Sequence, residues 1–249
     1  MMAADQSVRD LPDAQAQRPA SAGQEPHRNG RIVPGDDDGA FAPPLIQDLA
    51  RSKVPPGFRG RSAVYVQLWW IVQALLVHPS PQVFYGWRRF LLRCFGARIG
   101  KGVLIRPSVQ VTYPWKVEIG DWSWVGDDAK LYSLGPIKIG RNAVVSQGSH
   151  LCAGSHDHRD PRFTLIAKPI TIEDQAWVAA DAFIAMGVTV GAGAIVGARS
   201  VVLRNVPPMV IACGFPARVI GPREMGPRRE EEAGPECAPP PTEPGATRR

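Results

Sequence analysis

The sequence predicts an all-β fold: a β-helix of six-residue repeats, preceded by a helical segment and flanked by two disordered tails. Three observations support this prediction. Aliphatic residues recur every six positions beyond Ala97, an apolar run extends from Ala63 to Val77, and both ends of the 249-residue chain are rich in Pro, Gly and charge.

Residues 1–60 are expected to form a disordered tail. They are rich in Ala, Pro, Gly, Gln and Asp and show almost no periodic apolar pattern. Such a segment buries too little apolar surface to offset the entropy lost on ordering. Residues 221–249 combine Pro, Gly and mixed charge, so the same argument predicts a second tail. The folded body is expected to span residues 61–220.

Residues 61–96 are expected to be helical. The run AVYVQLWWIVQALLV is shorter than the ~18 apolar residues that suggest a membrane span, and Gln67 and Gln73 interrupt it. One interpretation is a helix buried against the rest of the domain. The alternative is an amphipathic helix on a membrane surface, helped by the Trp and Arg residues of GWRRFLLR at 86–93.

Residues 97–206 carry the six-residue repeat. Neither the 3.6-residue period of a helix nor the two-residue period of a strand explains a sustained six, whereas a β-helix does. Each aliphatic residue is expected to point inward, and the Gly that often follows it fits a tight corner. The longest unbroken series is Ile172, Val178, Ile184, Val190, Val196 and Val202. Residues 207–220 form a C-terminal extension.

A loop at residues 157–169 interrupts the repeat directly after His156 and contains Arg159, Arg162 and Lys168. An excursion on a regular scaffold is where function tends to lie. The net charge of +6 suits an anionic small molecule, whereas the scattered basic residues match no nucleic-acid-binding pattern. The four cysteines show no paired spacing, which favours a reduced, cytoplasmic setting, with the inner membrane face as an alternative.

The repeat array, the stretch GSHDHRDP at 154–161 and the closing NVPPMVIACGFPARVI at 205–220 resemble the hexapeptide-repeat O-acetyltransferases. This group includes the galactoside, maltose, nodulation-factor and serine acetyltransferases. The upstream part from Phe84 is similar to the colanic acid biosynthesis acetyltransferase branch. The resemblance implies a left-handed parallel β-helix, a homotrimer with active sites between subunits, and direct acetyl transfer from acetyl-CoA to a hydroxyl.

The resemblance places the catalytic histidine at His156. Its chemistry fits this role, because an imidazole with a pKa near ~6.5 can remove the proton of an attacking hydroxyl. Asp157, Asp160 or a backbone carbonyl could orient the ring. His150 is expected to be structural, and His158 to be a surface residue or an acceptor contact. Histidines on this prism also raise the γ-type carbonic anhydrases, but a spacing of two on a loop is poor metal geometry, so no metal is predicted.

The resemblance also indicates where both substrates bind. Ala180 and Ala198 are expected to contact the pantetheine arm of acetyl-CoA, and Arg204 and Arg218 its phosphates. Leu203 stands where the family has a hydroxyl donor. The sugar-binding aspartate and asparagine of the family are replaced by Leu134 and Gly126, so the nearest polar candidates for the acceptor are Tyr132, Ser133 and His158.

The prediction is therefore an acetyl-CoA-dependent O-acetyltransferase that acts on a saccharide or saccharide precursor in polysaccharide biosynthesis. An acetyltransferase for another hydroxyl, such as that of serine or an antibiotic, is one alternative. A β-helix scaffold that has lost activity is the other.

Overall fold

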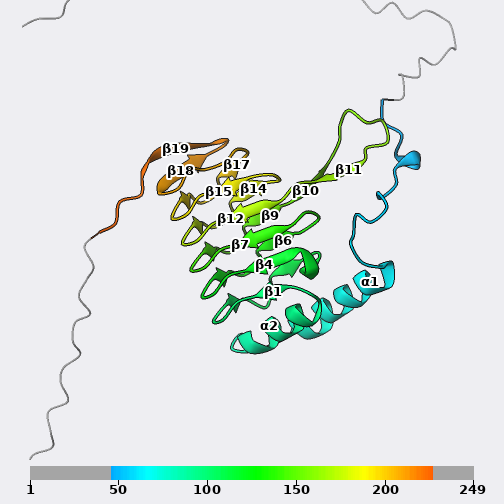
Figure 1. The fold of residues 1–249 in the computed structure, drawn as a ribbon, viewed down its shortest axis with the longest axis horizontal. Helices are drawn as coiled ribbons and strands as arrows, with labels where there is room; N and C mark the ends of the chain where they lie inside the picture. Colours follow the sequence, from blue (N-terminus) through cyan, green and yellow to red (C-terminus); the bar gives the residue numbers. More distant parts are fainter. Residues whose placement is uncertain (1–45, 227–249) are drawn as a thin grey trace, which may run out of the picture. The chain divides into compact units, whose positions relative to one another are not determined.

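The computed structural model describes residues 46–226. The tail predictions for residues 1–45 and 227–249 lie outside this range. Between these limits the chain forms a parallel β-helix with helices at its first coil (Figure 1). No helix within residues 46–226 is both long enough and apolar enough to cross a bilayer.

Three parallel sheets form the faces of the prism, and we name them A, B and C in the order in which the chain visits them. Sheet A contains β1 (Arg98–Ile99), β4 (Val117–Ile119), β7 (Ile137–Ile139), β12 (Ile170–Ile172) and β15 (Thr189–Val190). Sheet B contains β2 (Leu104–Ile105), β5 (Trp124–Val125), β8 (Val144–Val145), β13 (Trp177–Val178), β16 (Ile195–Val196) and β18 (Val210–Gly214). At its end β19 (Ala217–Pro222) pairs antiparallel with β18. Sheet C contains β3 (Gln110–Val111), β6 (Lys130–Tyr132), β9 (His150–Cys152), β14 (Phe183–Ala185) and β17 (Val201–Val202).

The aliphatic residues of the repeat point into the prism, as predicted. Val145, Val178, Ile184 and Val196 each have 0% of their surface exposed, and they belong to one continuous core. In-register pairing places each of them directly over its counterpart in the next coil, as Val178 lies over Val145. The β-helix prediction is confirmed.

The glycines after these aliphatic residues are required by stacking between coils. A Cβ atom on Gly126 would lie 2.6 Å from the backbone nitrogen of Gln147 in the next coil, and one on Gly140 would lie 2.5 Å from that of Asp174. Neither has a left-handed φ angle. The left-handed corners are occupied instead by residues such as Asn142 and Asp181, at φ 52° and 57°. These glycines were predicted to fit tight corners. The structure shows that they are needed because the backbones of adjacent coils approach closely.

The predicted helical segment forms α1 (Ala63–Val72), a π-helical turn η2 (Gln73–Val77) and α2 (Tyr85–Cys94). Its polar side chains cap the open edge of the first coil. The Trp69 indole donates to the Val111 carbonyl at 2.8 Å, and the Gln73 amide oxygen accepts from the Val111 N–H at 2.8 Å. The Arg88 guanidinium, which is fully buried, donates to the Ile105 carbonyl at 2.6 Å. Unpaired edge strands invite association, and the helices remove that edge here.

Both predicted tails begin farther from the prism than expected. Residues 46–60 include the short helix η1 (Leu49–Arg51), and the carbonyl of Arg59 accepts from the Trp115 indole at 2.7 Å. At the other end, Gly221 and Pro222 lie in β19, and the Arg223 side chain donates to the Gly193 carbonyl at 2.9 Å. The boundaries at 60 and 221 are therefore wrong. These contacts join segments far apart in sequence, so local composition did not reveal them.

Candidate active site

The loop that interrupts the repeat is a two-stranded hairpin. Strands β10 (Gly154–His156) and β11 (Leu165–Ala167) pair antiparallel, with His156 opposite Leu165. The hairpin leaves the edge between sheets C and A, after β9 and before β12 (Figure 1). The chain therefore departs from the prism at Gly154, three residues before the predicted start of the loop at Asp157. Ser155 is accordingly exposed, whereas the small residues at the matching repeat positions are buried.

His156 is held by the far side of this hairpin. Its Nδ1 lies 2.7 Å from the carbonyl oxygen of Phe163, and its ring stacks on the Phe163 ring at 4.1 Å with an interplanar angle of 9°. A carbonyl oxygen only accepts hydrogen bonds, so Nδ1 must carry the proton and Nε2 has the free lone pair. The orienting group is the backbone carbonyl and neither of the two aspartates.

Asp160 holds the turn that presents this carbonyl. Its carboxylate accepts from the Thr164 hydroxyl and from the Arg162 N–H, the latter at 3.0 Å. These hydrogen bonds lower the pKa of Asp160 to about 2, Thr164 making the largest contribution. Phe163 has a left-handed φ of 51°, which is costly for an aromatic residue. The turn therefore fixes an unfavourable backbone geometry that points a carbonyl at His156.

The other two histidines differ from His156 in their surroundings. His158 is exposed on the hairpin. His150 lies on the outer face of sheet C, edge-on to Phe183 at 5.4 Å and to Tyr132 at 6.1 Å. Burial, followed by the charge of Lys130, lowers the pKa of His150. Within residues 46–226, no group of three or more His, Cys, Asp or Glu side chains is arranged to hold a metal ion.

Tyr132 and Ser133, the two acceptor candidates in and after β6, differ in exposure. Tyr132 is 38% exposed on the outer face of sheet C, opposite Cys152 in the register of β6 and β9. Ser133 is fully buried, and its hydroxyl accepts from the Tyr113 N–H at 2.8 Å and donates to the Tyr113 carbonyl at 3.0 Å. The Ser133 hydroxyl is thus occupied within the subunit, and its role as an acceptor contact stays a prediction.

Ala180 and Ala198 lie together on the edge between sheets B and C. They follow β13 and β16 at equivalent positions of adjacent coils, and the Ala180 carbonyl accepts from the Arg199 N–H at 2.8 Å. Ala198 is exposed and Ala180 is half-buried. This edge therefore presents small side chains, as the prediction of a pantetheine contact requires.

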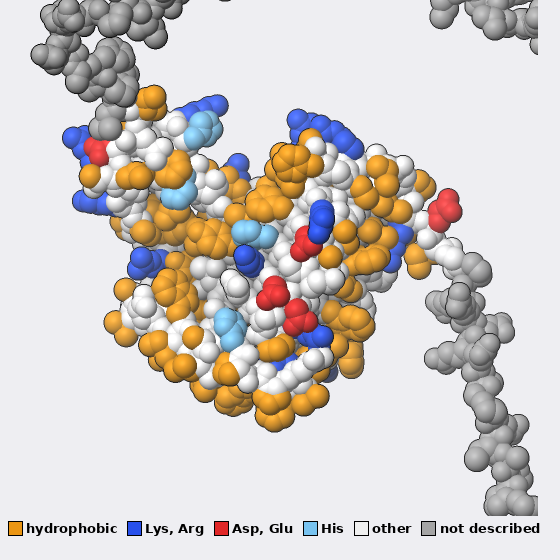
Figure 2. Space-filling view, turned by 180° about the vertical axis from the view of Figure 1, so that it is seen from behind, with side chains coloured by type: hydrophobic (Ala, Val, Ile, Leu, Met, Phe, Trp, Pro, Cys, Tyr) orange, Lys and Arg blue, Asp and Glu red, His pale blue; other side chains and the backbone are white. Residues whose placement is uncertain are grey.

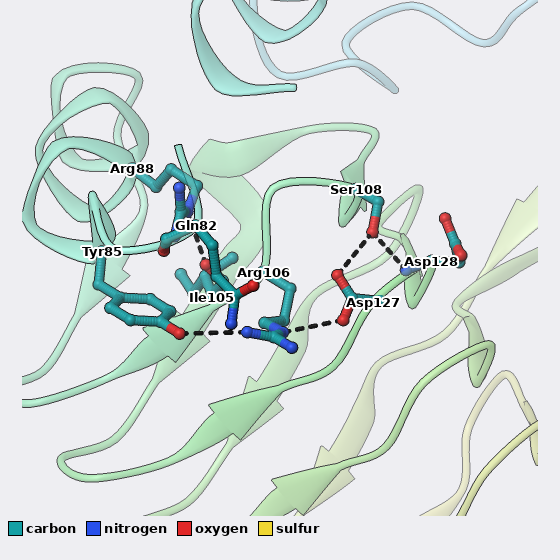
Figure 3. Close-up of polar contacts among 8 residues, drawn as sticks. All are labelled: Gln82, Tyr85, Arg88, Ile105, Arg106, Ser108, Asp127 and Asp128. Carbon is teal, nitrogen blue, oxygen red and sulfur yellow. Dashed lines mark hydrogen bonds and ion pairs between the residues drawn. The ribbon is translucent and has the colours of Figure 1, made fainter. Parts of the chain in front are cut away.

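A cavity of about 570 Å³ lies on the same edge and on the outer face of sheet B. Its walls include Trp124 and Trp177, with Val144 between them in the strand register. At one end, Arg106 donates to the Tyr85 hydroxyl at 3.2 Å and pairs with Asp127 at 2.8 Å (Figure 3). The sequence analysis did not predict this cavity. A signal was present, because the residue directly before each inward aliphatic residue of sheet B, such as Trp124 or Trp177, is also apolar.

The two arginines predicted to contact the phosphates do not lie on the edge that carries these alanines. Arg204 follows β17 on the edge between sheets C and A, the edge from which the hairpin leaves. Arg218 lies in β19, which extends sheet B, and its side chain donates to the Ala217 carbonyl at 3.1 Å. Both arginines are exposed. The structure thus places Arg204 and His156 on one edge and the two alanines on another.

Comparison with known proteins now adds to this geometry. The chain is 57% identical over 178 residues to the putative colanic acid biosynthesis acetyltransferase WcaF of Escherichia coli, an alignment covering 72% of this chain and 98% of that protein. The chain belongs to this family of hexapeptide-repeat acetyltransferases. It is an acetyltransferase, in agreement with the sequence prediction. A search against family models found no match.

Two further similarities are consistent with this membership. Galactoside O-acetyltransferase of Escherichia coli is 35% identical over 95 residues, which cover 37% of this chain and 46% of that protein. A hexapeptide-repeat acetyltransferase of Vibrio cholerae, solved with acetyl-CoA, superposes with a TM-score of 0.60 at 26% identity over 67% of this chain and 92% of that one. The acetyltransferase family and the fold thus agree.

Proposed function

We propose that this enzyme transfers the acetyl group of acetyl-CoA to a hydroxyl of a saccharide or saccharide precursor in polysaccharide biosynthesis, with His156 as the general base. The observation that carries the proposal is the hydrogen bond from His156 Nδ1 to the Phe163 carbonyl, because it leaves Nε2 free to accept a proton. The solved Vibrio cholerae relative with acetyl-CoA supports the donor. The name of the Escherichia coli relative supports the polysaccharide pathway.

The proposed reaction proceeds in two proton transfers around one tetrahedral intermediate. Nε2 of His156 removes the hydroxyl proton as the oxygen attacks the thioester carbonyl, so that the new C–O bond forms while the imidazole becomes positively charged. Collapse of the intermediate breaks the C–S bond. The imidazolium then returns the proton to the departing thiolate, which leaves as free coenzyme A, and the histidine is neutral again.

We also propose that the enzyme is a trimer whose donor site forms between subunits. Within one subunit, Ala180 and Ala198 occupy a different edge from Arg204 and His156. A single acetyl-CoA that touches both sets needs the edge of a second subunit. The apolar outer face of sheet B, with Trp124 54% exposed and Trp177 43% exposed, supports such an assembly. A cytoplasmic location stays a prediction.

The test is thiol release from acetyl-CoA with a panel of hydroxyl acceptors. Sugars and nucleotide sugars should stimulate release, and stimulation by serine or an antibiotic alone would favour the other acceptor class. If no acceptor of the panel stimulated thiol release, the result would favour a scaffold without activity. His156→Ala should lower kcat by roughly 10²–10⁴-fold, the typical value of general-base catalysis, while the affinity for acetyl-CoA hardly changes.

The matched control is His158→Ala, on the same hairpin, which should change kcat at most several-fold. The kcat/KM of the wild type should be lower in acid, because a protonated imidazole cannot accept the hydroxyl proton, and the His156 variant should lose this dependence. If His158→Ala were inactive and His156→Ala active, the general-base assignment would be wrong. Arg204→Ala should raise the KM for acetyl-CoA more than it lowers kcat, as expected for a contact made equally in the ground and transition states.

A further inference from the structure

One helix face at the first coil is apolar and faces outward. Val64, Leu68, Ile71 and Leu75 follow one another at helical spacing along α1 and η2, with 78%, 49%, 53% and 66% of their surfaces exposed. The opposite side of the same helix buries Val66 and Trp69 against the prism. This helix is therefore apolar on both sides, although only one side contacts the protein.

A second exposed apolar row lies beside the first. It consists of Leu76 in η2, Val83 and Phe84 in the segment before α2, and Trp87 and Phe90 in α2. The Trp87 indole donates to the Leu76 carbonyl at 2.9 Å and so holds α2 against η2, which also carries Leu75 of the first row. Trp87 stacks with Phe90 at 5.9 Å. Figure 2 shows hydrophobic side chains along the edge of the molecule formed by these helices. We call both rows together the cap face.

The sequence around the cap face is strictly basic. From residue 49 to residue 117 there is no Asp or Glu, whereas eleven Lys and Arg residues occur in that interval. Several belong to the helices themselves or lie directly before them, among them Arg61, Arg89 and Arg93. The first carboxylate after Asp48 is Glu118, in the second coil. The helical end of the prism thus combines exposed apolar side chains with an excess of positive charge, although Arg98 and Arg106 pair with Glu118 and Asp127 of the second coil.

We propose that the cap face binds the surface of a bilayer that contains anionic lipids. Its apolar rows would enter the boundary between headgroups and acyl chains, with Trp87 near the headgroups and the arginines near lipid phosphates. Charge decides between this occupant and a second copy of the chain. A contact between two cap faces would bring two surfaces with the same excess of positive charge together, whereas an anionic bilayer neutralises that excess.

Flotation of the full-length protein with lipid vesicles tests the proposal. The wild type should float with vesicles of phosphatidylcholine and phosphatidylglycerol, float less with phosphatidylcholine alone, and be released in part by salt, because screening weakens the electrostatic contribution. Replacing Leu68 and Leu75 together by Asp should lower the vesicle-bound fraction at least about tenfold, since two buried leucine contacts are lost and two negative charges are added. All four positions used in the test and its control are exposed.

The matched control places the same change at the opposite end of the β-helix. Val219 and Ile220 in β19 are 51% and 66% exposed, and the double variant Val219→Asp/Ile220→Asp should float like the wild type. Phe90→Asp, in the second row, provides an independent test if the Leu68/Leu75 variant does not fold by circular dichroism. Two results would overturn the proposal: no flotation of the wild type, or a cap-face substitution that changes the oligomeric state in light scattering while flotation is unaffected. The test does not depend on acetyl transfer.

Discussion

Sheets A and B contribute equivalent inward residues to the prism, yet their outer faces are chemically different. In successive coils the outer face of sheet A carries Arg98, Glu118, Lys138, Thr171 and Thr189. At the matching positions, sheet B carries Leu104, Trp124, Val144, Trp177 and Ile195. The two sets occupy the same hexapeptide position and pair in the same parallel register, so backbone geometry does not explain the contrast. The contrast is expected if sheet B is covered in the proposed trimer and sheet A meets water.

Inward and outward positions of the repeat are therefore subject to different constraints. Inward residues must fill a prism of constant cross-section, so those in the strands of the three faces from Ile99 to Val202 are Val, Ile or Leu, whereas those at the corners are mostly Ala, Val or Ser. Outward residues are free of that constraint, so their polarity depends on whether the face meets water or another protein surface. An apolar, tryptophan-bearing face is expected to be covered, and a face with alternating charges is expected to meet water.

The largest expected effect comes from placing a charge on sheet B. Ile195→Asp should dissociate the proposed trimer at micromolar concentration, because a carboxylate would be buried without a partner in the subunit contact. Since the donor site is proposed to need two subunits, acetyl transfer should fall by about 100-fold or more. Size-exclusion chromatography with light scattering measures the first effect, and thiol release measures the second.

Thr189→Asp is the matched control, because Thr189 lies six residues earlier at the same position of the same coil on sheet A. It should remain trimeric and active. Equal behaviour of the two variants would contradict the assignment of sheet B as the subunit contact.

The next effect tests whether the two faces are equivalent beneath their surfaces. Gly120 follows a strand of sheet A and Gly126 follows a strand of sheet B, and an added Cβ would lie 2.7 Å and 2.6 Å from the backbone of the next coil. Each Gly→Ala substitution should therefore lower the free energy of unfolding by roughly 1–3 kcal/mol, the usual cost of overpacking. Chemical denaturation measures it.

Gly221→Ala provides the comparison, since no atom lies within 4 Å of its added Cβ. It should change stability by less than about 0.5 kcal/mol. A large cost at only one of the two stacked glycines would show that the coils do not pack alike at the two corners.

The regular part of this fold was predictable because its period is set by geometry. Positions such as Val178 and Ile184 follow from a spacing of six alone, and the chain indeed buries both. The break at Gly154 was placed three residues late because Ser155 continues the repeat in sequence while pairing with Ile166 across the hairpin. The caps of the first coil, Trp69 and Arg88, were not predicted because their partners are 42 and 17 residues away.

The candidate site shows the same division. His156 could be named from its position before the interruption, but its partner could not, because a backbone carbonyl leaves no mark in a sequence. From the sequence, the Ser133 hydroxyl was expected to be free. Its hydrogen bonds to the Tyr113 backbone in the preceding coil could be recognised only once the register between coils was known. Residue type therefore predicted candidates, and only the fold decided which polar atoms are available.

Sheet C allows a smaller test, because its outer face is mixed. His150 is flanked by Lys130 below and Phe183 above in the strand register. Burial and Lys130 lower the pKa of His150 in the folded state, so below about pH 6.5 the unfolded chain binds more protons there than the folded chain. Stability should therefore be fully present above that pH and decline as the pH falls through the folded pKa.

His150→Gln should remove this component. Its melting temperature should drop less than that of the wild type between about pH 7.5 and about pH 5.5, a range that spans the ordinary histidine pKa. Differential scanning calorimetry at both pH values measures the difference. A steeper acid-side loss in the variant would contradict the stated sign.

The smallest expected effect concerns the charge ladder of sheet A. Glu118 accepts from Arg98 at 2.6 Å and lies 4.0 Å from Lys138, but the side chains of Arg98 and Lys138 are 82% and 62% exposed. Exposed ion pairs are weakened by water and salt, so Glu118→Gln should reduce the free energy of unfolding by only about 0.2–1 kcal/mol in dilute buffer. In about 1 M salt, where the screening length is only a few ångströms, the difference should nearly vanish. Denaturation at the two salt concentrations measures both values. If Glu118→Gln instead dissociated the trimer as Ile195→Asp is expected to do, the charged face would be a subunit contact too, and the outer residues of the repeat would no longer separate a covered face from an open one.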